Sequence, residues 1–269
     1  MPVFKTADAE LFYETAGAGE PMLLLHGLGS STLDWEQTMA RFAPTHRVIA
    51  FDFRGSGASR DLERPSGPFN VRQFSSDAAA LLEHLGATPA HIVGLSLGGV
   101  VAFDLAVERP TLLRTLTIVN SAPAMVVPGG AATAIILLRR VVARVFGPQG
   151  MAKMLAPKLF PDPAHETQRQ TFIKRMGRNR RGAYIATQLA ALGWSVRDRM
   201  KDIAAPTLVV SAEHDYPFLQ NKQEWAREIP DCEYVEVAGA HHALPMEYPE
   251  RFHEIVEGFL AKHRGAAGK

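Results

Sequence analysis

The chain has 269 residues, of which 46% are hydrophobic, and its formal net charge is +1 at pH 7. The size allows one large domain or a core domain with an inserted module, and a charge so close to zero does not indicate nucleic-acid binding. The single cysteine, Cys232, excludes an internal disulfide bond and favours a reducing compartment. The N-terminus lacks a signal-peptide pattern and no apolar stretch could span a bilayer, so we expect a cytoplasmic protein without a transmembrane segment.

Strands and helices alternate over the first 120 residues. Apolar runs bounded by turn residues predict strands, and apolar positions at helical spacing predict helices between them. This alternation is typical of an α/β fold, in which helices cover both faces of a mostly parallel sheet. The expected strands are 21–26, 47–51, 91–95 and 113–119, and the expected helices are 32–42, 74–85 and 97–108.

The alternation stops over residues 121–202, which contain helical stretches and many prolines and glycines. We therefore divide the chain into a core in two parts, 1–120 and 203–269, and a helical cap at 121–202. Such an insert is expected to lie over the carboxyl ends of the strands, where ligands bind in these sheets. The second part of the core is predicted to contain two strands and two helices, at 205–211, 233–237, 220–228 and 249–263.

The insert differs from the rest of the chain in charge. Between Ser121 and Met200 there are 13 lysine and arginine residues and three acidic residues, a balance of +10, so the remainder carries about −9. Charge runs are most often solvated, and an exposed cationic face is the first interpretation. The alternative is a cationic rim that attracts anionic substrates. The densest part of the run contains Arg175, Arg178, Arg180 and Arg181.

A G-x-S-x-G turn, Gly94-Leu95-Ser96-Leu97-Gly98, lies between the strand predicted at 91–95 and the helix predicted at 97–108. A serine on such a turn has its hydroxyl raised out of the sheet, and small residues around it prevent a clash between strand and helix. The N–H groups at the start of the helix point to where an oxyanion would form. The alternative interpretation is a glycine-rich junction with an incidental serine.

A serine hydroxyl becomes a nucleophile when an oriented base takes its proton. Downstream of Ser96, Asp215 follows one predicted strand, and His241 and His242 follow the next. The carboxyl ends of parallel strands meet at one edge of a sheet, so these side chains are expected close together. Their order along the chain, serine then acid then histidine, is that of parallel-sheet hydrolases.

Two more stretches complete the pattern, His26-Gly27-Leu28-Gly29 and the turn from Asp52 to Gly57. Together with Gly94 to Gly98 and the loops of Asp215 and His242, they resemble the α/β-hydrolase superfamily, in its lid-bearing branch of serine esterases, enol-lactonases and carbon–carbon hydrolases. The resemblance covers about residues 10–262. It implies the α/β-hydrolase fold with an inserted helical cap, and it is more specific for nucleophilic hydrolysis than for any substrate.

The resemblance implies His242 as the base. In the family a glutamate follows the catalytic histidine by five residues and a proline stands two further on, where this chain has Glu247 and Pro249. His241 replaces the usual glycine and is the alternative base. The acid is expected to be Asp215, because the strand that precedes the insert ends without a carboxylate.

Glu213 is the alternative acid. The resemblance also implies an oxyanion hole formed by the N–H groups of Leu28 and Leu97, and the alternative is a tight turn without that role. Pocket walls are expected from the loops and from large side chains of the cap, which are equally consistent with a small core of the cap itself. These candidates are His26, Gly27, His241, Phe146, Phe160 and Trp194.

We therefore expect a serine hydrolase that cleaves small carboxylic esters through an acyl-enzyme, without a cofactor or a metal. Hydrolysis of an enol-lactone or of a carbon–carbon bond in aromatic degradation is the alternative, and a non-catalytic ligand-binding member of the fold is a second. The expected partner is a small-molecule ester or lactone. The sequence does not indicate whether the chain forms a homo-oligomer.

Overall fold

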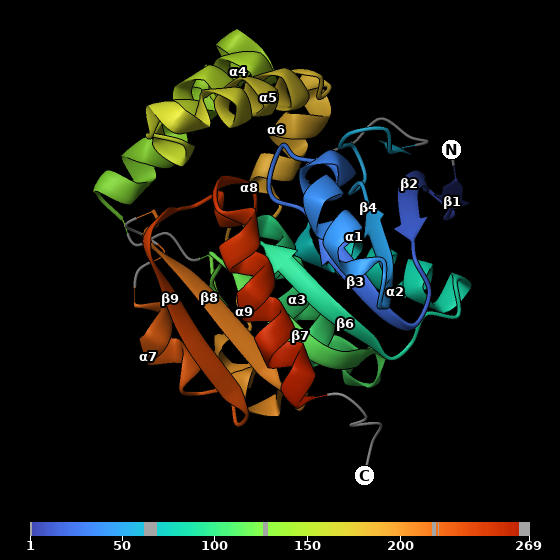
Figure 1. Ribbon diagram of the computed structural model, residues 1–269. Coiled ribbons are helices and arrows are strands. Elements are labelled where there is room, and N and C mark those ends of the chain that lie inside the picture. Colours follow the sequence, from blue (N-terminus) through green and yellow to red (C-terminus); the bar gives the residue numbers. More distant parts are fainter. Residues whose placement is uncertain (1, 62–68, 126–128, 217–218, 220, 264–269) are drawn as a thin grey trace.

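The computed structural model describes residues 2–61, 69–125, 129–216, 219 and 221–263 (Figure 1). Within them the strands form one sheet in the order β1-β2-β4-β3-β6-β7-β8-β9, and the short β5 pairs with β2. The six strands from β4 to β9 in this order run parallel, whereas β1, β2 and β5 are antiparallel to their neighbours. The strands are β1 Val3–Lys5, β2 Ala9–Ala16, β3 Glu20–Leu25, β4 His46–Phe51, β5 Arg60–Asp61, β6 Ala90–Leu95, β7 Leu113–Val119, β8 Thr207–His214 and β9 Cys232–His241.

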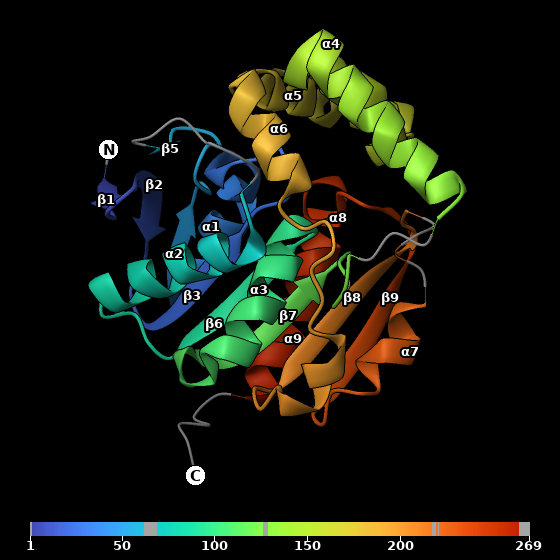
Figure 2. The same cartoon turned by 180° about the vertical axis from the view of Figure 1, so that it is seen from behind.

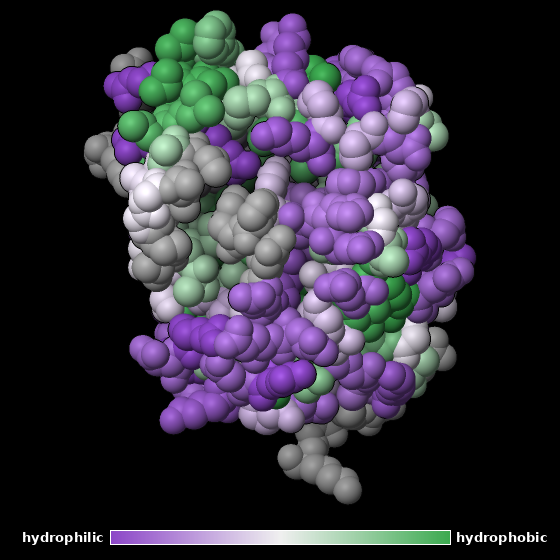
Figure 3. Space-filling model, turned by 90° about the vertical axis from the view of Figure 1, so that its left-hand side faces the viewer, coloured by the Kyte–Doolittle hydropathy of each residue, from purple (hydrophilic) through white to green (hydrophobic). Residues whose placement is uncertain are grey.

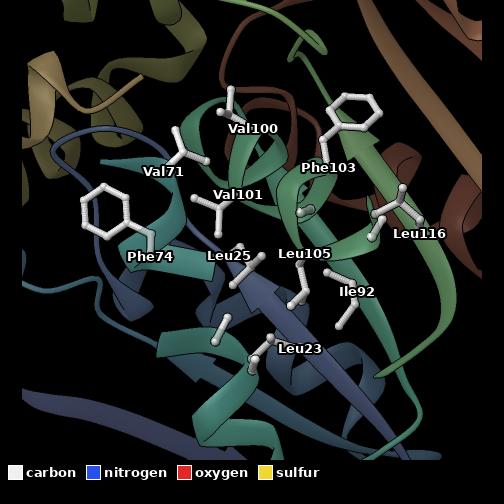
Figure 4. Packing of buried hydrophobic residues seen from close by; sticks show 14 of the residues in the cluster. Leu23, Leu25, Val71, Phe74, Ile92, Val100, Val101, Phe103, Leu105 and Leu116 are labelled. Carbon is white, nitrogen blue, oxygen red and sulfur yellow. The ribbon is translucent and has the colours of Figure 1, made fainter. Parts of the chain in front are cut away.

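Helices cover both faces of the sheet, which confirms the predicted α/β fold. Successive side chains of a strand point to opposite faces, so β3 divides its residues between two cores. Leu23 and Leu25 pack toward one pair of helices (Figure 4), and Met22 and Leu24 pack toward the other. The first pair is α2 Val71–His84 and α3 Leu97–Glu108, and the second is α1 Glu36–Phe42 and α9 Pro249–Lys262 (Figures 1 and 2).

Helix α2 begins three residues before the predicted start because of its cap. The side chain of Asn70 accepts a hydrogen bond from the N–H of Gln73 at 2.9 Å, and the side chain of Gln73 accepts one from the N–H of Asn70 at 3.0 Å. This reciprocal pair satisfies two of the N–H groups that a helix start leaves unpaired. The apolar residues Phe74 and Ala78 then face the sheet.

The helical insert follows β7 and precedes β8 along the chain, and it lies above the carboxyl ends of the parallel strands (Figure 1). Gly147, with a φ of 68°, interrupts the long α4, which is therefore two helices joined at a kink. The insert has a small core of its own, in which Phe160, Phe172 and Met176 are buried. Its helices are α4 Ala131–Leu159, α5 Glu166–Gly177 and α6 Arg181–Leu189. The division at 120 and 202 stays our prediction for the limits of this cap.

Helix α4 turns an apolar face outward. Figure 3 shows hydrophobic side chains gathered at the upper left of the molecule, over the cap. Phe146, which we expected to wall the pocket, belongs to this face and is 65% exposed. Among the residues of the helix whose side chains are described, the other large apolar ones that are exposed are Leu137, Leu138, Val141 and Val145.

The hydrophobic pattern of the sequence did not predict the antiparallel strands β1, β2 and β5 at one edge of the sheet. Strands β1, β2 and β5 carry charged residues among their apolar ones, and edge strands of this kind have a weak hydrophobic pattern. The helix predicted at 220–228 is the shorter α7 Lys222–Ala226, and Gln220 lies outside the described residues. The short α8 Leu244–Glu247 was not predicted. Among the described helices, none combines the length and the hydropathy that crossing a membrane requires.

Candidate active site

Ser96 lies on a strained turn between β6 and α3, with φ 55° and ψ −115°. A non-glycine residue pays for such a backbone conformation, and it persists only where the surroundings hold it. Here the N–H of Ser96 donates to the carbonyl of Val119 at 2.9 Å, and the hydroxyl of Ser121 donates to the carbonyl of Ser96 at 2.7 Å. Gly98 has no room for a side chain, because a Cβ would collide with the carbonyl of Leu25.

The loops after β6, β8 and β9 bring together the serine, the acid and the histidine. The hydroxyl of Ser96 lies 2.9 Å from Nε2 of His242, and Nδ1 of His242 lies 2.5 Å from Oδ1 of Asp215. An ionised carboxylate can only accept, so the Nδ1–H donates to it and leaves Nε2 to accept from the serine. This tautomer is the one in which the imidazole can take the proton of the hydroxyl.

Asp215 lies in a buried network that includes a lysine the sequence did not indicate. Nζ of Lys222 lies 2.6 Å from Oδ2 of Asp215, and both side chains are 2% exposed. The N–H of Tyr216 donates to Oδ1 of Asp215 at 2.7 Å. Burial raises the pKa of Asp215, but His242 and Lys222 outweigh burial and hold this pKa below its usual value. A lysine in a helix is usually solvated, so the sequence contains no signal for this contact.

Two polar side chains hold the histidine loop. Nδ2 of Asn120 donates to the carbonyl of His242 at 2.9 Å, and Oδ1 of Asn120 accepts from the N–H of Ala212 at 2.8 Å. Asn120 therefore joins the ends of β7 and β8 to this loop. Glu247 is buried and accepts from both the N–H and the Nδ1–H of His241, at 2.6 and 2.7 Å. These bonds direct the ring of His241 toward Glu247, while His242 contacts Ser96.

The loop that follows β3 lies against the serine turn. A Cβ on Gly27 would lie 3.5 Å from the Cβ of Ser96. His26 supports this loop, since its Nδ1 donates to the carbonyl of Gly27 at 2.7 Å and its Nε2 accepts from the N–H of Phe53 at 3.0 Å. Complete burial lowers the pKa of His26 to about 4, so the ring is neutral, and its two hydrogen bonds hold this loop in place.

A small pocket opens beside Ser96, with a volume of about 100 Å³. Leu28 and Leu97, whose N–H groups are the predicted oxyanion donors, line it together with Ser96 and His242. Leu97 is the first residue of α3, a position whose N–H has no partner within the helix. Pockets for drug-sized ligands measure roughly 300–1,000 Å³, so this one suits a short acyl or alcohol group.

The cap contributes an arginine to the pocket. Arg139 of α4 lines it, and the guanidinium carbon of Arg139 lies 4.9 Å from the ring centroid of Tyr216. The ring of Tyr216 in turn packs 4.3 Å from that of His242. Across the described part of the chain, the lining contains this one arginine and no carboxylate. The remaining lining residues are Val100, Asn120, Ser121, Met125, Thr187, Gln188, Ala191 and Leu219.

The other candidates lie away from the pocket lining. Phe160 packs 6.1 Å from Phe172, ring centroid to ring centroid, in the core of the cap. Trp194 packs on the core domain, and its indole N–H donates to Asp104 at 3.1 Å. The alternative acid, Glu213, is exposed and accepts from the N–H of Gly239 at 2.7 Å. The sequence could not place these side chains because their contacts join distant segments.

Comparison with known proteins shows the family of the chain. The family model described as "Alpha/beta hydrolase family" matches residues 22–255. The chain belongs to this family. Among curated relatives, a protein from Azorhizobium caulinodans that carries the name carbamate hydrolase RutD is 30% identical, over 97% of this chain and 99% of its own. The 3-oxoadipate enol-lactonase 2 of Acinetobacter baylyi is 26% identical, over 97% of this chain and 99% of its own.

Two solved structures extend the likeness to three dimensions. An enol-lactonase from Burkholderia xenovorans superposes with a TM-score of 0.86 at 25% identity, over 97% of this chain and 100% of its own. A thermophilic esterase from Thermogutta terrifontis, described with malate bound, has a TM-score of 0.82 at 27% identity, over 95% of this chain and 94% of its own. The relatives are therefore hydrolases of several substrate classes on one fold.

Proposed function

We propose that the chain is a serine hydrolase that cleaves small carboxylic esters through an acyl-enzyme. The observation that carries the proposal is the continuous set of hydrogen bonds from Ser96 through His242 to Asp215, of which Ser96 and His242 line a pocket. In this mechanism Ser96 attacks the ester carbonyl while His242 takes its proton, and the N–H groups of Leu28 and Leu97 stabilise the oxyanion.

The second half of the reaction uses the same groups. His242 gives its proton to the leaving alkoxide, and an acyl group stays on Ser96. His242 then takes a proton from water, which attacks the acyl carbonyl and releases the acid. Asp215 orients the imidazole and stabilises the imidazolium in both steps.

The test is hydrolysis of a panel of p-nitrophenyl esters, with lactones and vinylogous diketones beside them. We expect short-chain esters to be cleaved and Ser96→Ala to lower kcat by about 10⁶-fold while the circular dichroism spectrum stays the same. Labelling by an active-site phosphonate, absent in Ser96→Ala, separates an enzyme from a binding protein of the same fold. Unchanged turnover in Ser96→Ala would contradict the proposal.

A second candidate is hydrolysis of an ester or lactone that carries a carboxylate, as an enol-lactone of a dicarboxylic acid does. Arg139 favours it, because this cation lines the pocket and a guanidinium binds a carboxylate through two parallel hydrogen bonds. The likeness to enol-lactonases and to an esterase described with malate supports the same substrate class. Preference for uncharged esters over matched esters with a terminal carboxylate would contradict this candidate.

A further inference from the structure

A glutamate and two histidines meet at the edge of the sheet opposite to Ser96, where β4, β3 and β6 begin. Glu20 pairs with His46 across β3 and β4, and His91 pairs with Met22 across β6 and β3. Partners in a parallel ladder point to the same face, as do residues two apart in one strand. The side chains of Glu20, His46 and His91 therefore share a face, and one ligand atom from each lies within 4.8 Å of the others.

Each histidine is oriented by a threonine. Nδ1 of His46 lies 2.8 Å from the hydroxyl of Thr45, and Nδ1 of His91 lies 2.9 Å from the hydroxyl of Thr115. With Nδ1 bonded in this way, Nε2 is the nitrogen that can bind an ion. Nε2 of His91 faces Glu20, 3.3 Å from its Oε2.

The carboxylate of Glu20 is oriented through its other oxygen. Nη1 of Arg114 lies 3.3 Å from Oε1 of Glu20, which leaves Oε2 toward His91. Glu20 and His91 thus each have an outer neighbour at the atom that does not face the other, and His46 has Thr45 at its Nδ1. Metal sites in proteins have this arrangement, because outer hydrogen bonds hold the ligands in position and raise their basicity.

An ordinary ion pair between Glu20 and His91 is the competing explanation. That pair joins Glu20 and His91 alone, with Nε2 of His91 3.3 Å from Oε2 of Glu20, and it does not account for His46 in the same cluster. Divalent metals bind imidazole in its neutral form and carboxylate in its ionised form.

We propose that Glu20, His46 and His91 bind one divalent transition-metal ion, with zinc as the expected ion. Imidazole and carboxylate are ligand types that zinc takes in proteins. Ligand atoms around tetrahedral zinc lie about 3.4 Å apart, a spacing that Glu20 and His91 already have. His46 supplies the third ligand, with its ligand atom within 4.8 Å of those of Glu20 and His91. The ion joins three neighbouring strands at their beginning, far from the hydrolytic groups, so its role is structural.

The test is a titration of chelator-treated protein with Zn²⁺ and with Co²⁺. We expect one ion per chain, a Co²⁺ absorption spectrum in the visible range, and a thermal midpoint that rises with the zinc concentration. Glu20→Gln should weaken zinc binding by at least about 100-fold, and Thr115→Val by about 10–100-fold as the loss of an outer hydrogen bond. Ester hydrolysis by Glu20→Gln should keep its kcat, so the result does not depend on the proposed function.

His214→Gln is the matched control. The His214 ring lies 5.1 Å from that of His241 near the hydrolytic groups, where adventitious zinc could bind. Unchanged affinity in this variant supports the proposal. If His214→Gln abolishes binding, if Glu20→Gln leaves it unchanged, or if wild-type protein binds no zinc at all, the proposal is wrong. Glu20 is partly exposed and His91 is buried, so we expect Glu20→Gln to fold and to test the proposal even if His91→Gln does not fold.

Discussion

The core and the cap contribute differently to the pocket beside Ser96. The core supplies the proposed reactive groups, on loops at the carboxyl ends of β6, β8 and β9, and hydrogen bonds hold each of them. The cap supplies walls, including Arg139, Thr187 and Gln188. We infer that changes in the core alter the rate for every substrate, whereas changes in the cap alter the choice among substrates.

The contact between the two regions also accounts for part of their opposite charges. Arg175 of the cap donates to the carbonyl of Leu33 at 2.5 Å, and its guanidinium lies 3.3 Å from Asp34 and 2.6 Å from Glu36. Arg199 pairs with Glu108 in the same way. Some of the positive charge in the insert thus binds the core, a contact between distant segments that the charge pattern of the sequence does not show.

Among the residues that support Ser96, replacing the acid should have the largest effect. Asp215→Asn keeps the shape of the side chain but favours the wrong tautomer of His242, so we expect kcat to fall by about 10⁴-fold for all esters. The measurement is steady-state hydrolysis of charged and uncharged p-nitrophenyl esters. Glu213→Gln, two residues away, should keep full activity. A large loss in Glu213→Gln instead would reverse the assignment of the acid.

The buried lysine should affect stability and its dependence on pH. Lys222→Met leaves Asp215 without its ammonium partner, and breaking a buried pair typically costs about 3 kcal/mol of unfolding free energy. Arg227→Met, on the exposed end of α7, should stay within roughly 0.5 kcal/mol of wild type. Denaturant titrations check both values.

The sign of the pH effect follows from the pKa of Asp215. This carboxyl titrates below its unfolded value of about 3.9, so its stabilisation is present above that pH and is lost as the pH falls through the folded-state pKa. Removing Lys222 raises the folded-state pKa, so the acid loss of stability should begin at a higher pH. If the unfolding free energy of Lys222→Met falls over the same acid pH range as that of wild type, the assigned contact between Lys222 and Asp215 is wrong.

A change in the pocket wall should alter selectivity alone. We expect Arg139→Ala to lower kcat/KM for esters with a terminal carboxylate by about 10–100-fold, the equivalent of one charge-assisted hydrogen bond, and to leave uncharged esters nearly unaffected. Arg140→Ala is the matched control, because Arg140 is the next residue of α4 and is exposed. Equal losses for both ester classes would show that the cap also acts on the reactive groups.

The smallest effect is expected at the contact between cap and core. Arg175→Ala removes half-buried ion pairs, which contribute up to about 1 kcal/mol each. KM should rise modestly, and the difference from wild type should shrink at high salt. Lys174→Ala, exposed on the same helix, is the control. A change in kcat without a change in KM would contradict a role in holding the cap.

The hydrophobic pattern predicted β3, β4, β6 and β7 to within one residue at each end, because buried strands such as 91–95 are continuous apolar runs, and it predicted parts of β8 and β9. It missed β1 and β2, whose pattern is broken by charges, and α8, which is a single turn. Ser96, Asp215 and His242 could be proposed because each lies just after a strand, and parallel strands end at the same edge. Their hydrogen-bonded geometry supports that proposal.

The amino-acid sequence by itself indicated the family, the alternation of parallel strands and helices, and Ser96, Asp215 and His242 as the candidate catalytic side chains, since these depend on local patterns and short motifs. Only the tertiary structure decided which neighbours hold them. The contact of Lys222 with Asp215, the bond from Asn120 to the histidine loop and the place of Arg139 in the pocket all join different elements. No local pattern records such contacts, because they arise only when the sheet and the cap have packed.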